Sequence, residues 1–325
     1  MPKFTIHHLT KYNYEEAVRD SANQIMLFPI KDEYQEVNSQ YITITGEPAV
    51  EVFKDYYGND VGTFMNIAAH TELKIESKIN IITKPRLFPP DDIAIEEQWN
   101  HLNQLKSIVP FIDFLKQENF LALNEVKQIL DAGFYKSVSV YVAVLQLTQY
   151  VYQEFKYIKG ITSIETTLDE IWQLKAGVCQ DFAHILLVTL RLLGIPARYV
   201  SGYVCPIDND LRGEGATHAW VEAYIPFYGW LGFDPTNNCI VNDQHVRLAI
   251  GRNFSDCSPV KGTYKGTSKQ VLEVGVSVSR ENGNLTPQVI IELQPVTIKI
   301  NEDGSLNNSY RNYMDLVQQQ QQQQQ

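Results

Sequence analysis

The sequence predicts an α+β protein in which a strand-rich N-terminal domain precedes a domain of mixed helices and strands. Up to about Pro90, apolar and polar residues alternate with the period of two that is typical of half-buried strands. From about Ile93 the apolar residues follow helical spacing, and strand-like runs return from Arg198 onward. Strands, then helices, then strands again indicate an α+β architecture, and the change of period places a domain boundary near residue 92.

Residues 1–92 are expected to form a small β-sandwich-like domain. Residues 4–14 alternate strictly, and residues 41–45 are a short β-branched run that ends at a Gly-Glu-Pro turn. A Tyr-Gly-Asn-Asp turn at residues 57–60 separates two further strand-like runs. Residues 72–83 alternate again before Lys-Pro ends the strand. At least four antiparallel strands joined by hairpin turns are typical of a sandwich-like layer.

The middle of the chain is expected to be helical. Apolar residues follow helical spacing in residues 96–119, 122–132 and 138–155. Thr167 followed by Glu170 has the form of a capping box, which predicts a helix through Leu174. A further helix is expected from about Val178 to Leu193, because Gly194 is a typical C-terminal cap and a proline follows it.

The last third of the chain is expected to return to strands. The strand-like runs cover residues 198–204, 219–224, 229–233, 271–278 and 288–300. A second domain is therefore expected over residues 93–300. Residues 301–325 form a C-terminal extension that ends in a run of glutamines, and we expect this end to be disordered because such a run cannot build a core.

Length, charge and cysteine content exclude several classes of protein. The chain has 325 residues, a formal net charge of −11 and four cysteines, too few for a disulfide framework. It lacks the excess of Lys and Arg that binding to nucleic acid or to an anionic membrane requires. The N-terminus lacks the apolar core of a signal peptide, and no apolar run approaches the roughly 18 residues of a membrane span. We therefore expect a cytoplasmic protein with no nucleic-acid or membrane partner, and we predict no particular oligomeric state.

Cys179 is the first candidate for a chemical role. Gly177 lets the chain turn out of one predicted helix, so that Cys179 falls in the first turn of the next. At a helix N-terminus, unpaired N–H groups and the positive end of the helix dipole stabilise a thiolate. A lone cysteine is more often a small buried hydrophobic residue. The position of Cys179 therefore supports a reactive thiol only if partner residues are found as well.

His218 and Asp234 are the candidate partners of Cys179. His218 opens an apolar strand, and Asp234 ends the next strand after a five-residue connection. In an antiparallel pair these two positions lie side by side, which lets a carboxylate orient an imidazole and select its tautomer. Taken alone, His218 could be a hydrogen-bonded core histidine, and Asp234 could be a turn residue before proline. Together with Cys179 at a helix start, the two residues predict a Cys-His-Asp triad.

Several runs of the sequence resemble those of a known family. The runs that carry the resemblance are GVCQDFAH at residues 177–184, LGIPARYVSGY at 193–203, HAWVE at 218–222, GFDPTNN at 232–238, GRNFSD at 251–256, PVKGTY at 259–264 and HLTKYNY at 8–14. Together they are similar to the bacterial transglutaminase-like superfamily of cysteine enzymes, of the cysteine-protease type, including its N-terminal β domain. One departure is Asn253, where the family often has aspartate.

The resemblance implies a papain-like catalytic core with Cys179 as nucleophile, His218 as general base and acid, and Asp234 as the residue that orients it. The implied chemistry is acyl transfer from a peptide or protein amide through a thioester, with water or an amine as the second nucleophile. The backbone N–H of Cys179 is the natural first donor to the oxyanion. Candidates for a second donor are Gln180, Tyr157 and Trp172, each of which packing or surface exposure also explains.

Two other functions stay open at this stage. One is transamidation of glutamine side chains, and the other is a noncatalytic binding or assembly module that retains the fold. Arg198 is expected to form an ion pair with Asp181 or Glu222, and His184 is expected in the core. No metal or cofactor is expected. The remaining cysteines do not have the spacing of metal ligands, even if His245 is counted as a further ligand; these cysteines are Cys205, Cys239 and Cys257.

Overall fold

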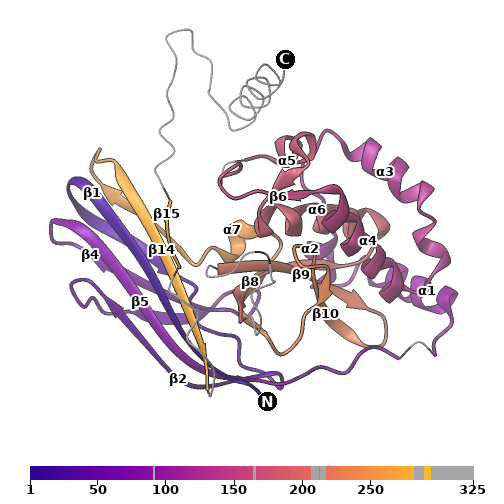
Figure 1. Cartoon of the computed structure of the whole chain (residues 1–325), viewed down its shortest axis with the longest axis horizontal. Coiled ribbons are helices and arrows are strands. Elements are labelled where there is room, and N and C mark those ends of the chain that lie inside the picture. Colours follow the sequence, from indigo (N-terminus) through magenta and orange to yellow (C-terminus); the bar gives the residue numbers. More distant parts are fainter. Residues whose placement is uncertain (91, 164–165, 206–211, 213–216, 282–288, 294–325) are drawn as a thin grey trace, which may run out of the picture.

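A computed structural model of the chain describes residues 1–90, 92–163, 166–205, 212, 217–281 and 289–293, the last range by its backbone alone. The expected C-terminal extension at 301–325 lies outside the described residues. Two antiparallel sheets lie side by side, and helices cover the far face of the second sheet (Figure 1). This arrangement agrees with the predicted α+β class.

The first sheet contains the strands of the N-terminal region together with strands from the far end of the described chain. Its members are β1 (Lys3–Ile25), β2 (Gln35–Ile44), β3 (Glu51–Lys54), β4 (Asp60–Asn66), β5 (His70–Thr83), β13 (Val260–Lys265), β14 (Gln270–Arg280) and β15 (Val289–Leu293). Along the start of β1 the side chains alternate between buried and more exposed, as the period of two predicts.

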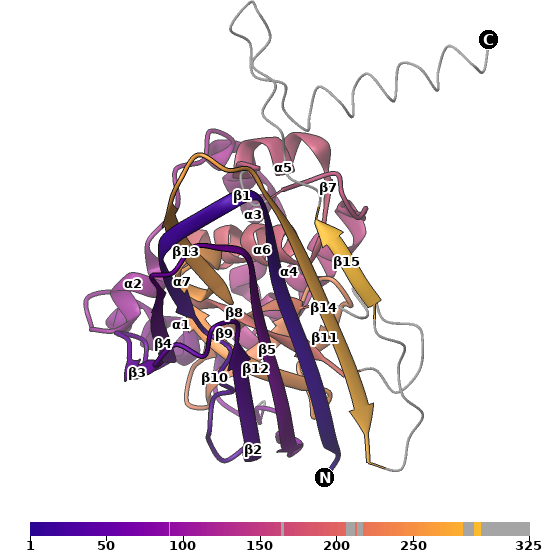
Figure 2. The same ribbon diagram turned by 90° about the vertical axis from the view of Figure 1, so that its left-hand side faces the viewer.

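Strand β1 takes part in both halves of this sheet. Its first half pairs with β5 and β14, and its second half pairs with β4 and β13. The register shifts between Asn13 and Val18 on one side and between Arg19 and Ala22 on the other. Figure 2 shows the bend that β1 makes between its two halves. Such irregularities bend a strand and increase its twist, so the two halves of β1 can pair with different sets of strands.

Strands β13 and β14 differ from the expected division of the chain. Residues 260–280 are expected in the second domain at 93–300, but they pair with β1. Phe4 lies opposite Arg280, and the pairing continues to Tyr14 opposite Gln270. The first sheet is therefore built from both ends of the chain, which a local pattern of alternation cannot reveal.

The second sheet has the strand order β11–β10–β9–β8–β12. Its strands are β8 (Ala197–Val204), β9 (Thr217–Ile225), β10 (Gly229–Asp234), β11 (Cys239–Ile240) and β12 (His245–Gly251), and a separate parallel pair joins β6 (Lys156–Tyr157) to β7 (Ala176–Gly177). Nearly every residue of β8 and β12 is buried, because helices cover one face of this sheet and the first sheet covers the other.

The helices follow the predicted segments with one interruption. They are α1 (Ile95–Leu105), α2 (Phe111–Leu115), α3 (Leu123–Ala132), the 3₁₀ turn η1 (Tyr135–Ser137), α4 (Val140–Glu154), α5 (Leu168–Leu174), α6 (Cys179–Leu193) and α7 (Phe254–Cys257). The single helix expected over 96–119 is interrupted between Leu105 and Phe111, in a segment that ends at Pro110, which has no N–H to donate within a helix. The capping box of Thr167 and Glu170 and the left-handed cap at Gly194 are confirmed.

Helix α6 is the central element of the second layer. It packs against β8 and β9 on one side and against α4 and α5 on the other. Most of its residues are buried, including Phe182, Leu186 and Leu190. None of the helices in the described part of the chain combines the length and the apolar character needed to cross a bilayer. The buried body of α6 fixes the position of its N-terminus relative to β8 and β9.

Candidate active site

Cys179 is the first residue of α6, and a short turn before it holds the start of the helix in place. The carboxylate of Asp181 accepts hydrogen bonds from the backbone N–H of Val178 (2.8 Å) and from the hydroxyl of Thr162 (2.6 Å). Glycine is required at Gly177, because a Cβ atom there would lie 2.4 Å from Oδ2 of Asp181. The turn therefore presents the Cys179 side chain at the N-terminus of α6.

Cys179 differs from the other cysteines in its surroundings. It is half-buried at the N-terminus of a 15-residue helix, where free N–H groups and the helix dipole favour a thiolate. Cys205 and Cys257 are buried, and burial raises the pKa of both thiols above the usual range. Burial and then the charge of Asp234 raise the pKa of Cys239 to about 12. Cys179 is therefore the thiol best suited to nucleophilic attack.

His218 and Asp234 contact each other on adjacent strands. His218 lies on β9 and Asp234 ends β10, and these strands pair antiparallel with Phe233 opposite Val221. Nε2 of His218 donates a hydrogen bond to Oδ2 of Asp234 over 2.8 Å, and neither side chain is exposed. The sequence analysis expects these two residues side by side, and their catalytic roles stay a prediction.

Asp234 is surrounded by hydrogen-bond donors. Oδ1 accepts from the backbone N–H groups of Thr236 (2.9 Å) and Asn237 (3.3 Å). Oδ2 accepts from the side-chain amide of Asn237 (2.7 Å) and from Nε2 of His245 (3.5 Å), besides His218. Burial by itself raises the pKa of Asp234, but His218 and then His245 outweigh it and hold that pKa well below the usual range. The carboxylate is therefore ionised although it is fully buried.

The second ring nitrogen of His218 is not used by Asp234. Nδ1 of His218 is buried and has no hydrogen-bond partner among the described residues. Burial lowers the pKa of His218, but the charge of Asp234, its hydrogen bond and the nearby Cys179 raise it to about 10. Because Asp234 accepts from Nε2, Nδ1 is the ring nitrogen that remains available to a further partner.

The three candidates for a second oxyanion donor have different surroundings. Tyr157 lies opposite Gly177 in the β6–β7 pair, and burial, followed by Cys179, raises the pKa of its hydroxyl, which stays protonated. Gln180 follows Cys179 in the first turn of α6 and is half-buried. The indole N–H of Trp172 donates to Glu125 over 2.9 Å, so its single donor is already used. Tyr157 and Gln180 therefore lie close to Cys179, whereas Trp172 is held in the helical core.

The other polar residues singled out from the sequence are structural. Nε of Arg198 donates to Oε2 of Glu222 over 2.8 Å, which confirms one of its two expected partners. Glu222 is fully buried, and Arg247 approaches its other carboxylate oxygen at 3.4 Å. Nε2 of His184 accepts the backbone N–H of Phe254 over 3.2 Å, and burial lowers the pKa of His184 to about 4. These contacts link β8, β9 and β12 within the second sheet and hold α6 against α7.

A possible metal-ligand set lies beside the candidate triad. One ligand atom from each of Asp234, Cys239 and His245 lies within 4.8 Å of the other two. Both oxygens of Asp234 already accept hydrogen bonds from protein donors, so these side chains fit a hydrogen-bonded cluster better than a metal site. Sequence analysis did not identify His245 and Asn237 as partners of Asp234. Asn237, three residues after Asp234, could have been found from its spacing, whereas His245 belongs to a more distant strand.

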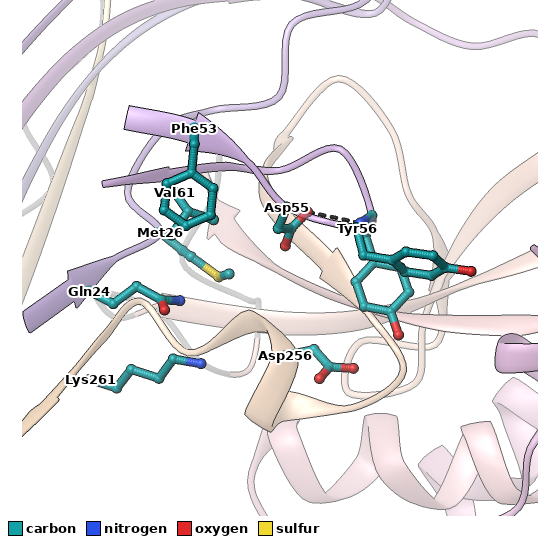
Figure 3. Close-up of a pocket in the computed structure, with 9 residues that line it drawn as sticks. Gln24, Met26, Phe53, Asp55, Tyr56, Val61, Asp256 and Lys261 are labelled. Carbon is teal, nitrogen blue, oxygen red and sulfur yellow. Dashed lines mark hydrogen bonds between the residues drawn. The ribbon is translucent and has the colours of Figure 1, made fainter. Parts of the chain in front are cut away.

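Two surface cavities lie apart from the candidate triad. One, of about 210 Å³, is lined by β3 and β4 on one side and by Asp256 and Lys261 on the other (Figure 3). The carboxylate of Asp55, which lines this cavity, accepts a hydrogen bond from the backbone N–H of Tyr57 over 2.9 Å. The other, of about 430 Å³, lies between α1 and Phe227. Neither cavity is lined by Cys179, His218 or Asp234, so neither belongs to this site.

Comparison with known proteins identifies the family. The model of the transglutaminase-like superfamily matches residues 135–235, and that of the bacterial transglutaminase-like N-terminal region matches residues 4–81. A protein of Mycobacterium leprae is 32% identical over 286 residues, which cover 86% of this chain and 99% of that relative. The chain belongs to the transglutaminase-like superfamily. The resemblance stated from the sequence motifs is therefore confirmed.

A relative and a solved structure extend this result. A protein of Mycobacterium tuberculosis is 28% identical over 292 residues, which cover 85% of this chain and 92% of the relative. The crystal structure of a candidate cysteine protease from Cytophaga hutchinsonii matches with a TM-score of 0.70 at 23% identity, covering 88% of this chain and 93% of that one. The structural match confirms the predicted fold, a transglutaminase-like core preceded by a strand-rich region.

Proposed function

We propose that this member of the transglutaminase-like superfamily is a cysteine-dependent acyl-transfer enzyme that hydrolyses amide or peptide bonds. One observation carries the proposal. Nε2 of the buried His218 is hydrogen-bonded to Asp234, which leaves Nδ1 for Cys179 at the start of α6. This is the arrangement that an activated nucleophile requires: a thiol, a base that takes its proton, and a carboxylate that orients the base.

The reaction proposed for this site has two stages. The Cys179 thiolate attacks the amide carbonyl, and a carbon–sulfur bond forms while the carbonyl electron pair moves to oxygen. Protonated His218 then gives its proton to the leaving amine, the carbon–nitrogen bond breaks, and a thioester remains. Water next attacks the thioester, His218 accepts one of its protons, and the carboxylic acid leaves as the thiolate is restored. Asp234 stabilises the imidazolium in both stages.

The developing oxyanion needs donors beside Cys179. The backbone N–H of Cys179 lies at the N-terminus of α6, where helix N–H groups have no intrahelical partner. Tyr157 or Gln180 supplies the second donor in this proposal, because both lie next to the nucleophile and Tyr157 stays protonated. The substrate class is a peptide or protein amide, and we place the reaction in the cytoplasm.

Transamidation is the second candidate function, and one comparison favours it. A stretch of 73 residues is 40% identical to the protein-glutamine gamma-glutamyltransferase of Pseudomonas aeruginosa, although it covers only 21% of this chain and 11% of that protein. Both candidates share the thioester and differ only in whether water or an amine resolves it. We favour water, because no feature of the described residues marks an amine site beside Cys179.

Two measurements test the proposal. Alkylation by iodoacetamide across a range of pH, with the labelled peptide identified by mass spectrometry, is expected to modify Cys179 faster than a free thiol near neutral pH. A screen of glutamine peptides for ammonia release, amine incorporation and chain cleavage is expected to show hydrolysis that Cys179→Ala abolishes. Ordinary reactivity of Cys179, together with activities unchanged in Cys179→Ala, would favour a noncatalytic binding module. Amine incorporation without hydrolysis would favour transamidation.

A further inference from the structure

We propose that His245 is a positioning residue that holds the carboxylate of Asp234, and through it the imidazole of His218, in the productive orientation. The inference rests on the proposed function of Cys179, His218 and Asp234. Among the described residues His245 contacts Asp234 and Trp220 but not Cys179, so we assign its effect on the reaction to the hydrogen bond with Asp234.

The fold brings His245 to Asp234 from a strand that is not adjacent to β10. His245 begins β12, at one edge of the second sheet, and pairs with Val204 of β8. Its side chain is 2% exposed, and Nε2 lies 3.5 Å from Oδ2 of Asp234. The ring also meets the indole of Trp220 edge-on, with the ring centres 5.3 Å apart. This packing fixes the plane of the imidazole.

The neighbours of His245 assign its proton. An ionised carboxylate only accepts hydrogen bonds, so Nε2 of His245 carries the proton toward Asp234. Nδ1 then accepts the backbone N–H of Asn242 over 3.4 Å. The side-chain oxygen of Asn242 lies 3.2 Å from the same nitrogen and accepts the backbone N–H of Gln244 over 2.9 Å. Burial lowers the pKa of His245, which agrees with a neutral ring.

Two imidazoles therefore donate to one carboxylate oxygen. His218 and His245 both reach Oδ2 of Asp234, and their ring centres lie 6.5 Å apart. Without His245, Oδ2 keeps Asn237 and His218, but one donor to a buried charge is lost and the carboxylate is freer to rotate. Rotation moves the point at which His218 is held, and Nδ1 of His218 then faces Cys179 less well.

The test compares His245→Gln, His245→Phe and the unaltered protein. Glutamine places an amide N–H near the position of Nε2, whereas phenylalanine fills the space without a donor. The readout is the rate of Cys179 alkylation by iodoacetamide, followed peptide by peptide, and kcat and KM for the amide substrate that the screen selects. His8→Gln is the matched control, since His8 is fully buried too but bonds Tyr203 and Thr10 instead.

We expect His245→Phe to lower the alkylation rate and kcat by about 10-fold, the size of one lost hydrogen bond to a charged group, with KM unchanged. His245→Gln is expected to recover most of the loss, and His8→Gln to leave both rates unchanged. Equal rates in all proteins would overturn the inference, as would equal losses in both His245 variants. Loss of activity of the unaltered protein in a chelator would also overturn it, in favour of a metal. Slow alkylation of the unaltered protein would instead refute the proposed function itself.

Discussion

Glu222 and Asp234 are buried carboxylates on neighbouring strands, and they differ in the groups that neutralise them. Glu222 on β9 lies among arginines, with Arg198 at 2.8 Å and Arg247 at 3.4 Å. Burial raises its pKa, but Arg198, Arg247 and Arg86 lower it to about 2. Asp234 at the end of β10 is neutralised mainly by His218, with smaller help from His245.

The difference separates a structural charge cluster from a chemical one. A guanidinium group keeps its proton under all ordinary conditions, so the Glu222 cluster is a fixed set of charges. An imidazole can give up and regain a proton, so the charge beside Asp234 can move during a reaction. Burial of the carboxylate is common to both, and therefore the partner residues decide which cluster can take part in catalysis.

The largest expected effect is that of Asp234→Asn. An amide at this position cannot stabilise the imidazolium and can present an N–H to Nε2 of His218, which favours the wrong tautomer. We expect the rate of amide hydrolysis and of Cys179 alkylation to fall by about 10³-fold or more. Steady-state kinetics and labelling of the same preparation measure the two rates. A variant that keeps near-normal rates would show that Asp234 has only a structural role.

Glu222→Gln tests the opposite side of the comparison. Removal of this charge leaves the largely buried Arg198 without its counter-ion and Arg247 with Asp32 alone, so we expect the free energy of unfolding to fall by about 3 kcal/mol. Denaturant titration measures the loss, with Glu97→Gln on the exposed surface of α1 as the control. Rates per folded molecule are expected to stay unchanged. If catalysis falls while stability does not, the assignment of Glu222 to structure is wrong.

Asp181 extends the comparison to a buried carboxylate that has no charged partner among the described residues. Burial outweighs its hydrogen bonds from Thr162 and Val178 and raises its pKa to about 6 from the usual 3.8. The folded state therefore binds a proton that the unfolded state releases, and the contribution to stability is complete below pH 3.8 and lost as pH rises through about 6. Relative to Asp181→Asn, the protein is expected to lose about 3 kcal/mol over this range. Parallel pH dependences of unfolding for the two proteins would contradict the raised pKa.

Gly177→Ala gives the smallest expected effect and bears on the same turn. The new Cβ would meet Oδ2 of Asp181 at 2.4 Å, so the carboxylate or the backbone must move. Such overpacking costs about 2 kcal/mol of unfolding free energy, which thermal or denaturant unfolding can measure. The control is Ala132→Gly, in the last turn of α3, a helix far from the site. Gly160→Ala does not serve as a control, because the φ angle of Gly160 is +78° and alanine would itself be strained there. Full stability of Gly177→Ala would show that the turn has room for a side chain.

Local patterns in the sequence were sufficient for much of the fold. The alternation in residues 4–14 predicts the buried face of β1, and the capping box at Thr167 predicts the start of α5. Gly194 ends α6 where the pattern places its end. These features depend on residues only a few positions apart, so the residues that cause them can be read directly.

Features that join distant segments could not be predicted in this way. The pairing of β13 and β14 with β1 depends on a register between residues more than 200 positions apart. The contact of His245 with Asp234 depends on how β12 is placed in the second sheet, which no short pattern records.

By itself, the sequence determined the α+β class, the family and the residues Cys179, His218 and Asp234 as a candidate triad. Those conclusions follow from short motifs and from the pairing of two consecutive strands, where chain connectivity limits the possible geometry. Only the tertiary structure decided which side chains surround Asp234 and that Trp172 is used elsewhere. The physical reason is that burial and hydrogen bonding are set by segments that meet in space, and their meeting depends on the packing of both sheets.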